Sequence, residues 1–286
     1  MNKRAGRGNL VVLAETLVVI LILSSVQSCA PTYKKPVSGS DAFSRAAAET
    51  AALMKLVEDT ALVAALPPEL TATLVASARA DGTRLEAELS PPGDPYLTLL
   101  VDKTHPLGAD YEPDDLIPLA GLSYTTNRTG LFLRAEAAEA LENMAKAANT
   151  EGINLSVSSA FRSYAYQKTL YERIVAELGQ EAADRESARP GHSQHQLGLA
   201  VDFGSIDDSF AETAASRWLA GNAVRFGWSL SYPQGMEALT GYRWESWHYR
   251  YVGIPTASLL EARFGEVQQY GLAFLREWQK IRGQAE

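Results

Sequence analysis

One stretch of the chain, residues 191–203, reads GHSQHQLGLAVDF and joins candidate metal ligands to a short strand pattern. Successive side chains of a strand point to opposite faces, so from Gly198 onward small residues share one face with Asp202. The other face is apolar, predicts a contact with the core, and carries Leu199, Val201 and Phe203. His195 has the opposite parity to Asp202, and one straight strand cannot direct both side chains toward the same ion. We therefore expect His195 on a turn or a short helical piece before the strand.

A second stretch, residues 244–251, reads WESWHYRY and supplies another histidine. Its aromatic residues alternate with His248, which predicts a second strand. Glu245 has the wrong parity relative to His248 for both to lie on one face of that strand. We expect Glu245 on the bend that leads into it.

The two stretches together offer His195, Asp202 and His248 as metal ligands. Three protein ligands with an open position are the catalytic form of a zinc site, whereas a structural site closes with a fourth ligand, usually a cysteine. The only cysteine is Cys29, far away near the N-terminus, which excludes a cysteine-based structural site. Zinc acidifies a bound water and polarises a carbonyl. Glu245 is not needed as a ligand, so it is the candidate general base.

The two remaining histidines are not expected to bind the metal. His105 lies in a segment that matches no metal motif. His192 would point away from the side that His195 uses if its segment is extended. We expect His192 behind the ligands or at the rim of the site.

Both stretches resemble the metal motifs of the VanY-type D-alanyl-D-alanine carboxypeptidases. These belong to the LAS zinc metallopeptidases, which also include dipeptidases, L,D-carboxypeptidases and cell-wall endopeptidases. The first family motif is similar to SxHxxGxAxD at residues 193–202, and the second to ExWH at residues 245–248, continued here as YRYVG. A third is matched by SAFRS at residues 159–163 with Gln167, although Ala160 stands where the family often has glycine.

The resemblance covers the chain from about Pro95 to its C-terminus and implies further site residues. Arg162 would stabilise the oxyanion or hold the substrate, and Ser193 and Gln167 would line the substrate pocket. On its own, Arg162 follows an alternating strand pattern, where a guanidinium could bind a peptide carboxylate or a developing oxyanion. Without the motif, an ordinary ion pair at the start of the next helix is the preferred interpretation.

The composition is typical of a soluble globular protein, with 46% hydrophobic and 21% charged residues in a chain of 286. The formal net charge of −8 argues against nucleic acid as a partner. The length leaves room for one sizeable domain and an appendage, and we expect a monomer. The expected parts are a signal or lipoprotein segment (1–29), a linker (30–41), a helical spacer region (42–92) and a VanY-like zinc peptidase domain (93–286).

Residues 1–29 have the pattern of an export signal. A basic start precedes the apolar run TLVVILIL at residues 16–23, and small polar residues follow. The segment VQSC at residues 26–29 resembles a bacterial lipobox, in which Cys29 becomes the lipidated first residue. A simple signal peptide and an uncleaved anchor are the alternatives. We expect an exported lipoprotein, anchored to the membrane in the cell envelope.

The predicted elements indicate an α+β fold. Two alanine- and leucine-rich helices at 43–66 and 68–88 could be a spacer, a packed helical pair or a partner-binding element. Later elements are a strand at 97–101, helices at 135–148 and 163–178, a loop at 180–190, a helix at 210–226, a strand at 228–230 and a final helix at 257–281. We expect a small sheet that carries the zinc, with helices packed around it. That the sheet is antiparallel is implied by the resemblance.

The resemblance implies a zinc-dependent peptidase of peptidoglycan stem peptides, and we expect a D-alanyl-D-alanine carboxypeptidase. L,D-carboxypeptidase or murein endopeptidase activity would use the same metal residues and stays open. A zinc-containing cell-wall-binding module without activity is an alternative, and the presence of Glu245 beside all three ligands argues against it. A structural lipoprotein in which residues 43–88 matter most is another.

Overall fold

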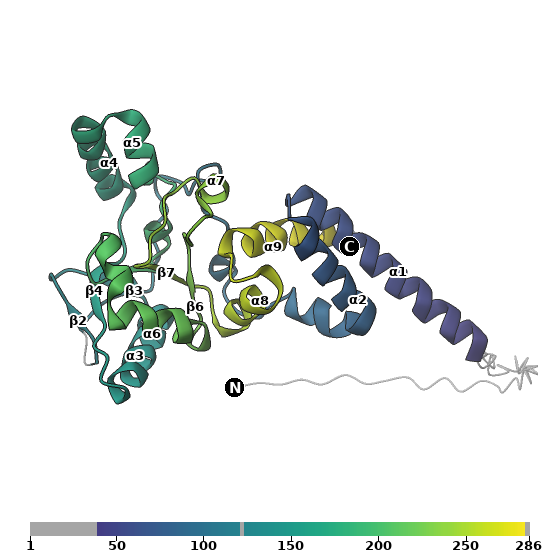
Figure 1. The fold of residues 1–286 in the computed structure, drawn as a ribbon. Coiled ribbons are helices and arrows are strands. Elements are labelled where there is room, and N and C mark those ends of the chain that lie inside the picture. Colours follow the sequence, from purple (N-terminus) through teal and green to yellow (C-terminus); the bar gives the residue numbers. More distant parts are fainter. Residues whose placement is uncertain (1–38, 121–122, 284–286) are drawn as a thin grey trace, which may run out of the picture. The chain divides into compact units, whose positions relative to one another are not determined.

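The computed structural model describes residues 39–120 and 123–283 (Figure 1). The export segment and lipidated Cys29 predicted for residues 1–29, and most of the predicted linker, lie outside the described residues. No helix within the described ranges is both long and apolar enough to cross a membrane. The unit that runs from Phe43 onward carries the candidate site.

A five-stranded sheet with the order β2-β4-β5-β7-β6 carries the candidate site. Its strands are β2 (Thr125–Thr126), β4 (Ser156–Ser159), β5 (Ala200–Phe203), β6 (Trp228–Leu230) and β7 (His248–Tyr251). Antiparallel ladders join β4 to β5, β5 to β7 and β7 to β6, whereas the edge strand β2 pairs with β4 in parallel. A parallel pair needs a long crossover, which the helix-containing chain between β2 and β4 supplies. The predicted α+β class is confirmed, and its sheet is mixed because of this one pairing.

Helices form most of the other regular structure. The α-helices are α1 (Gly39–Val63), α2 (Pro68–Glu88), α3 (Ala135–Thr150), α4 (Tyr164–Leu178), α5 (Gln180–Glu186), α6 (Ala214–Asn222), α7 (Glu237–Thr240), α8 (Ile254–Phe264) and α9 (Gln268–Gly283). Short 3-10 helices are η1 (Pro95–Leu97), η2 (Gln194–Leu197), η3 (Asp208–Glu212) and η4 (Ala223–Phe226). A small second sheet pairs β1 (Leu116–Pro118) with β3 (Phe132–Arg134).

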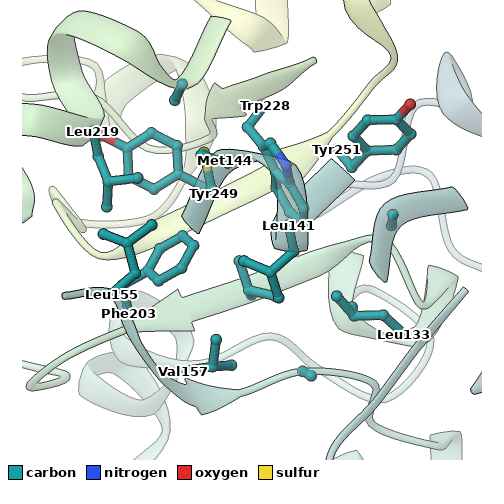
Figure 2. Packing of buried hydrophobic residues seen from close by; sticks show 14 of the residues in the cluster. Leu133, Leu141, Met144, Leu155, Val157, Phe203, Leu219, Trp228, Tyr249 and Tyr251 are labelled. Carbon is teal, nitrogen blue, oxygen red and sulfur yellow. The ribbon is translucent and has the colours of Figure 1, made fainter. Parts of the chain in front are cut away.

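The first hydrophobic core joins α3 to the five-stranded sheet. The predicted apolar stripe of α3 is buried there and comprises Leu141, Met144, Ala145 and Ala148. The apolar alternate residues of the first motif are buried in the same core, namely Leu199, Val201 and Phe203. Figure 2 shows Phe203 near Tyr249 of β7, and the two rings meet edge-on with centroids 5.9 Å apart. Because this parity of β5 is fixed in the core, Asp202 must point to the opposite face.

A second hydrophobic core joins α1 and α2 to the two C-terminal helices. Its buried members include Val57, Leu74, Leu85, Leu260, Phe274 and Trp278. In Figure 1, α2 lies beside α8, and Arg263 of α8 pairs with Glu88 of α2 at 2.9 Å. Of the three roles considered for the N-terminal helices, these contacts describe a helical pair packed on the rest of its unit.

The prediction of a strand at residues 97–101 is wrong. The chain forms η1 there, followed by irregular structure. Asp94 caps η1 by accepting a hydrogen bond from the backbone N–H of Tyr96 at 2.8 Å. Backbone carbonyls of this segment accept hydrogen bonds from the guanidinium of Arg250 instead of from a neighbouring strand. Its Nη2 donates to the carbonyls of Tyr96, Leu97 and Leu99 at 3.0, 3.2 and 2.8 Å.

Arg250→Met is expected to lower the free energy of unfolding by about 2–5 kcal/mol, because three backbone carbonyls in and after η1 would lose their donor. Arg250 is fully buried, and burial lowers its pKa to about 10, so it still carries its charge at neutral pH. Urea denaturation of the metal-free protein measures the effect. The matched control is Arg225→Met on the exposed side of η4, expected to stay within about 0.5 kcal/mol. Equal effects of the two substitutions would contradict this account.

Three other elements differ from the prediction. The segment at 180–190 begins with α5 rather than a loop, since Asp184 is held by Tyr171 and Arg189 at 2.5 and 2.8 Å. The helix expected at 210–226 is divided into η3, α6 and η4. The last helix is divided into α8 and α9, because the backbone turns through positive φ at Gly265 and Glu266.

Candidate metal centre

The sheet brings together His195, Asp202 and His248, the three residues predicted as metal ligands. One possible ligand atom from each lies within 4.8 Å of the others. Asp202 and His248 are paired in register on β5 and β7, and His195 lies on η2, just before β5. All three are at most 4% exposed. The short helical piece predicted for His195 is therefore present. It turns the side chain of His195 toward Asp202, which a continuous strand would not do.

The serine and the glycine of the first motif shape this helical piece. Ser193 precedes η2, and its Oγ accepts a hydrogen bond from the backbone N–H of His195 at 3.3 Å. Gly198 ends η2 with φ at 68°, a left-handed conformation that favours glycine. A Cβ atom at this position would also lie 2.9 Å from the side chains of Arg134 and Leu116. The motif thus turns the chain from η2 into β5 between two ligands.

The histidine nitrogens that face Asp202 suit a cation. Nδ1 of His195 lies 2.8 Å from the carbonyl of Ala160, which can only accept a hydrogen bond. Nδ1 therefore carries the proton, and Nε2 has a free lone pair. This Nε2 lies 3.2 Å from Oδ2 of Asp202 and has no hydrogen-bond partner. Nδ1 of His248 lies 3.1 Å from Oδ1 of the same carboxylate. A lone pair held against a buried carboxylate oxygen is repulsive unless a cation lies between them, so the donor set fits a metal ion.

The charges of these residues match a zinc site with two nitrogen ligands and one oxygen ligand. Burial, followed by the positive charge of Arg162, lowers the pKa of His195 to about 4, which keeps the imidazole neutral. Burial opposes ionisation of Asp202, but the positive charge of Arg162 favours the carboxylate, and the pKa of the carboxyl lies well below its usual range. Nη2 of Arg162 donates to Oδ2 of Asp202 at 2.7 Å.

Glu245 lies beside this group on the bend before β7, as its parity predicted. Its backbone carbonyl accepts from the N–H of His248 at 3.2 Å, which forms the turn into the strand. Its carboxylate Oε2 lies 3.4 Å from Nδ1 of His248. Burial, followed by the negative charge of Asp202, raises the pKa of Glu245 to about 8. A carboxylate with a raised pKa, placed beside a metal position, is a candidate proton acceptor.

The raised pKa of Glu245 predicts a pH-dependent loss of stability in the metal-free protein. The folded state holds this proton more tightly than the unfolded chain, where the pKa is near 4.5. The stabilising contribution is therefore complete below pH 4.5 and is lost as the pH rises to about 8. Glu245→Gln removes the titration, so wild type should lose stability relative to this variant across that range. Thermal unfolding in a chelator from pH 4 to 9 measures the difference, and a difference independent of pH would contradict the assignment.

Arg162 and Gln167 are joined to each other and to the site. Nε of Arg162 donates to Oγ of Ser159 at 2.9 Å, and its Nη1 lies 3.5 Å from Oε1 of Gln167. Gln167 is fully buried, and its Nε2 donates to the carbonyl of Ala188 at 2.7 Å. Gln167 thus holds both Arg162 and the segment after α5, and its predicted role as a substrate contact stays a prediction.

An open pocket lies against the three ligands and Glu245. Ser193 and Arg162 line it, and their contacts with a substrate stay a prediction. Its apolar wall comes from α4 and from segments around the sheet, and consists of Leu170, Ile174, Ile206, Tyr232, Tyr242 and Trp247.

The remaining polar contacts near the site involve the two other histidines and Gln194. Nδ1 of His105 lies 2.8 Å from Oδ1 of Asp102, and Nδ1 of His192 lies 2.8 Å from the carbonyl of the same residue. Both histidines are therefore engaged by Asp102, in agreement with their exclusion as ligands. Gln194 is a further residue of the site, because its Oε1 lies 3.3 Å from Nε2 of His248. Its place inside the first motif was the only available signal.

Comparison with known proteins finds relatives across the part of the chain that holds this site. Residues 130–254 match the family model described as VanY: D-alanyl-D-alanine carboxypeptidase. The Bacillus subtilis (strain 168) protein described as "Putative carboxypeptidase YodJ" is 36% identical over 178 residues, 60% of this chain and 65% of that protein. The chain thus spans less than two thirds of that relative. The "Bifunctional D-Ala-D-Ala dipeptidase and D-Ala-D-Ala carboxypeptidase VanXYC" of Enterococcus gallinarum is 31% identical over 179 residues, 60% of this chain and 91% of that protein.

Two solved structures are similar over about three fifths of this chain. The LdcB LD-carboxypeptidase matches with a TM-score of 0.56 and 33% identity, over 60% of this chain and 83% of that one. A mutant of the vancomycin resistance D,D-pentapeptidase VanY in complex with Zn(II) matches with a TM-score of 0.53 and 31% identity, over 62% of this chain and 99% of that one. With the family match across the whole candidate site and 31% identity over 91% of VanXYC, the chain belongs to the VanY D-alanyl-D-alanine carboxypeptidase family.

Proposed function

We propose that the protein is a zinc-dependent peptidase that hydrolyses peptidoglycan stem peptides and releases a C-terminal D-alanine as a D-alanyl-D-alanine carboxypeptidase. The observation that carries the proposal is the buried group of His195, Asp202 and His248 with Glu245 beside it. Its support also includes two similar structures, one of VanY in complex with Zn(II) and one of VanYB in complex with D-alanine-D-alanine. The export segment predicted at residues 1–29 would place the enzyme in the compartment of this substrate.

The proposed chemistry divides the work between the metal and the chain. Nε2 of His195, a carboxylate oxygen of Asp202 and Nδ1 of His248 would hold zinc, which supplies a Lewis acid that acidifies water and polarises the scissile carbonyl. Glu245 accepts the proton of the attacking water and returns it to the nitrogen of the leaving D-alanine. Burial raises the pKa of this carboxyl to about 8 in the metal-free protein, and a carboxylate held beside the attacking water is a suitable general base.

Arg162 supplies a fixed positive charge on the pocket wall. Its guanidinium is only 16% exposed and is held by Ser159 and Asp202, so it can meet an anion without reorganising. The anion is either the oxygen on which charge develops or the C-terminal carboxylate of the peptide. A carboxylate-binding role would restrict cleavage to the last residue of the peptide, which is the behaviour of a carboxypeptidase.

Incubation of the purified protein and zinc with defined stem peptides tests the proposal. Mass spectrometry should detect loss of one alanine from a pentapeptide that ends in D-alanyl-D-alanine. A tetrapeptide and a cross-linked peptide dimer serve as the other substrates. Absence of amide cleavage in all three, with zinc bound, would contradict a peptidase and favour a binding module.

L,D-carboxypeptidase activity is the second candidate function. It is favoured by the similarity to LdcB, an LD-carboxypeptidase whose structure is described as revealing the molecular basis of peptidoglycan recognition. Both activities would use the same metal ligands and Glu245, and they would differ in how far the peptide enters the pocket. Faster cleavage of the tetrapeptide than of the pentapeptide would assign the protein to this second activity.

A further inference from the structure

We propose that Gln194 and Gln268 form a hydrogen-bonded chain that fixes the tautomer of His248 and so makes them positioning residues for this metal ligand. The proposal rests on the metal-binding role proposed above. It also connects the last helix, α9, to the metal site through the side chain of Gln268. Gln268 stands at the start of α9, outside both motifs in the sequence.

The chain begins at a backbone carbonyl and ends at the imidazole. Nε2 of Gln268 donates to the carbonyl of Ser229 in β6 at 3.3 Å. Nε2 of Gln194 donates to Oε1 of Gln268 at 3.1 Å. Oε1 of Gln194 then lies 3.3 Å from Nε2 of His248. Gln268 and Gln194 are 1% and 4% exposed, so water does not compete for these contacts.

The carbonyl of Ser229 gives this chain a direction. A carbonyl only accepts, so the amide of Gln268 must turn its NH2 group toward it and its oxygen toward Gln194. The amide of Gln194 must then present its NH2 group to Gln268 and its oxygen to His248. An oxygen at that position requires a proton on Nε2 of His248, which leaves Nδ1 as the lone pair that faces Asp202. The opposite orientation of Gln194 would place two amide oxygens 3.1 Å apart.

A serine hydroxyl reinforces the same arrangement. Oγ of Ser231 donates to Oε1 of Gln194 at 2.7 Å and lies 3.4 Å from Oε1 of Gln268. By itself a hydroxyl could donate or accept, so Ser231 does not set the direction. It fills the remaining acceptor capacity of Gln194 and keeps its side chain in place. His195 reaches the same state in a single step, through the carbonyl of Ala160.

In this arrangement a pair of neutral glutamines can hold a metal-ligating histidine in one tautomer. Outer partners fix the tautomer and the ring orientation of a ligating histidine, and their loss typically costs about 10–100-fold in metal affinity. A lone pair on Nδ1 is what a cation between His248 and Asp202 would need. Because α9 also packs in the second core with α1 and α2, the N-terminal helices support the helix that holds Gln268.

Zinc affinity of the purified full chain tests the proposal, measured by competition with a chromogenic chelator. Gln268→Met keeps the length and burial of the side chain but removes both hydrogen-bonding groups, and it should weaken zinc binding about 10–100-fold. The matched control is Gln269→Met on the next residue of α9, which removes the bond to Oδ2 of Asp102 at 2.7 Å and should leave zinc affinity within about twofold. Equal zinc affinity of Gln268→Met and wild type would overturn the proposal.

A second measurement needs no substitution and therefore does not depend on a variant that folds. Nitrogen chemical shifts of 15N-labelled histidine in the zinc-loaded wild type report which nitrogen of His248 carries the proton. The proposal expects the proton on Nε2, and a proton on Nδ1 would overturn it. If wild type binds no zinc, the proposed function fails. If wild type binds zinc while His248 has the opposite tautomer, only the glutamine chain fails.

Discussion

Glu245→Gln is expected to reduce peptide hydrolysis by about 10²–10⁴-fold while the metal stays bound, because general base catalysis typically contributes this much. Glutamine retains the shape of the side chain and its place on the bend before β7. An amide, however, cannot accept the proton of the attacking water. The three predicted ligands are untouched, so zinc content should equal that of the wild type.

The assay combines turnover of the pentapeptide with the zinc content of the same sample. The matched control is Glu237→Gln in α7, which replaces an exposed carboxylate paired with Arg185 and should leave turnover unchanged. Retained activity in Glu245→Gln would assign the base to another group. Loss of zinc together with activity would instead show that Glu245 is a ligand.

His195→Ala is expected to remove both the metal and the activity. His195 supplies a buried nitrogen with no hydrogen-bond partner, and two ligands cannot replace three. We expect zinc affinity to fall by more than the roughly 100-fold upper limit for loss of an outer partner. Zinc should not restore turnover at concentrations that saturate the wild type.

The control for this substitution is another histidine of the same chain. His105 is held by Asp102 and belongs to none of the three ligand positions. His105→Ala should therefore keep one zinc ion and normal turnover. Loss of zinc in both variants would point to a general effect on folding, and retention of zinc in His195→Ala would remove His195 from the site.

The local features of the site could be predicted because they depend on residue parity. The alternation after Gly198 correctly placed three apolar residues in the core and Asp202 opposite them. The parity conflict between His195 and Asp202 required a turn, which the structure forms as η2. The parity of Glu245 relative to His248 likewise placed Glu245 on the bend before β7. Each of these expectations concerns neighbours in the sequence, whose relative directions follow from backbone geometry.

The features that escaped prediction depend on partners far away in the chain. The carbonyls of Tyr96 in η1 and of Leu99 after it accept hydrogen bonds from Arg250, about 150 residues later, and no local pattern in the sequence predicts these contacts. Gln194 and Gln268 are 74 residues apart, and neither has a composition that indicates a partner. The division between α8 and α9 depends on a left-handed Glu266, a conformation that glutamate rarely adopts.

The N-terminal helices show the same limit. Their composition predicted two helices, and the structure forms α1 and α2 close to the expected bounds. Composition alone left open whether they contact anything. Their partners are α8 and α9, which contribute Leu260, Phe274 and Trp278 to the shared core. Such contacts depend on tertiary packing, which an amphipathic pattern allows but does not specify.

The most direct test of the central claim is anomalous diffraction at the zinc absorption edge from crystals of the zinc-loaded protein. The account predicts one strong peak between Nε2 of His195, the carboxylate of Asp202 and Nδ1 of His248, with Glu245 close by but not coordinated. A zinc-loaded crystal with no peak at this position, or with its peak at other residues, would contradict the account.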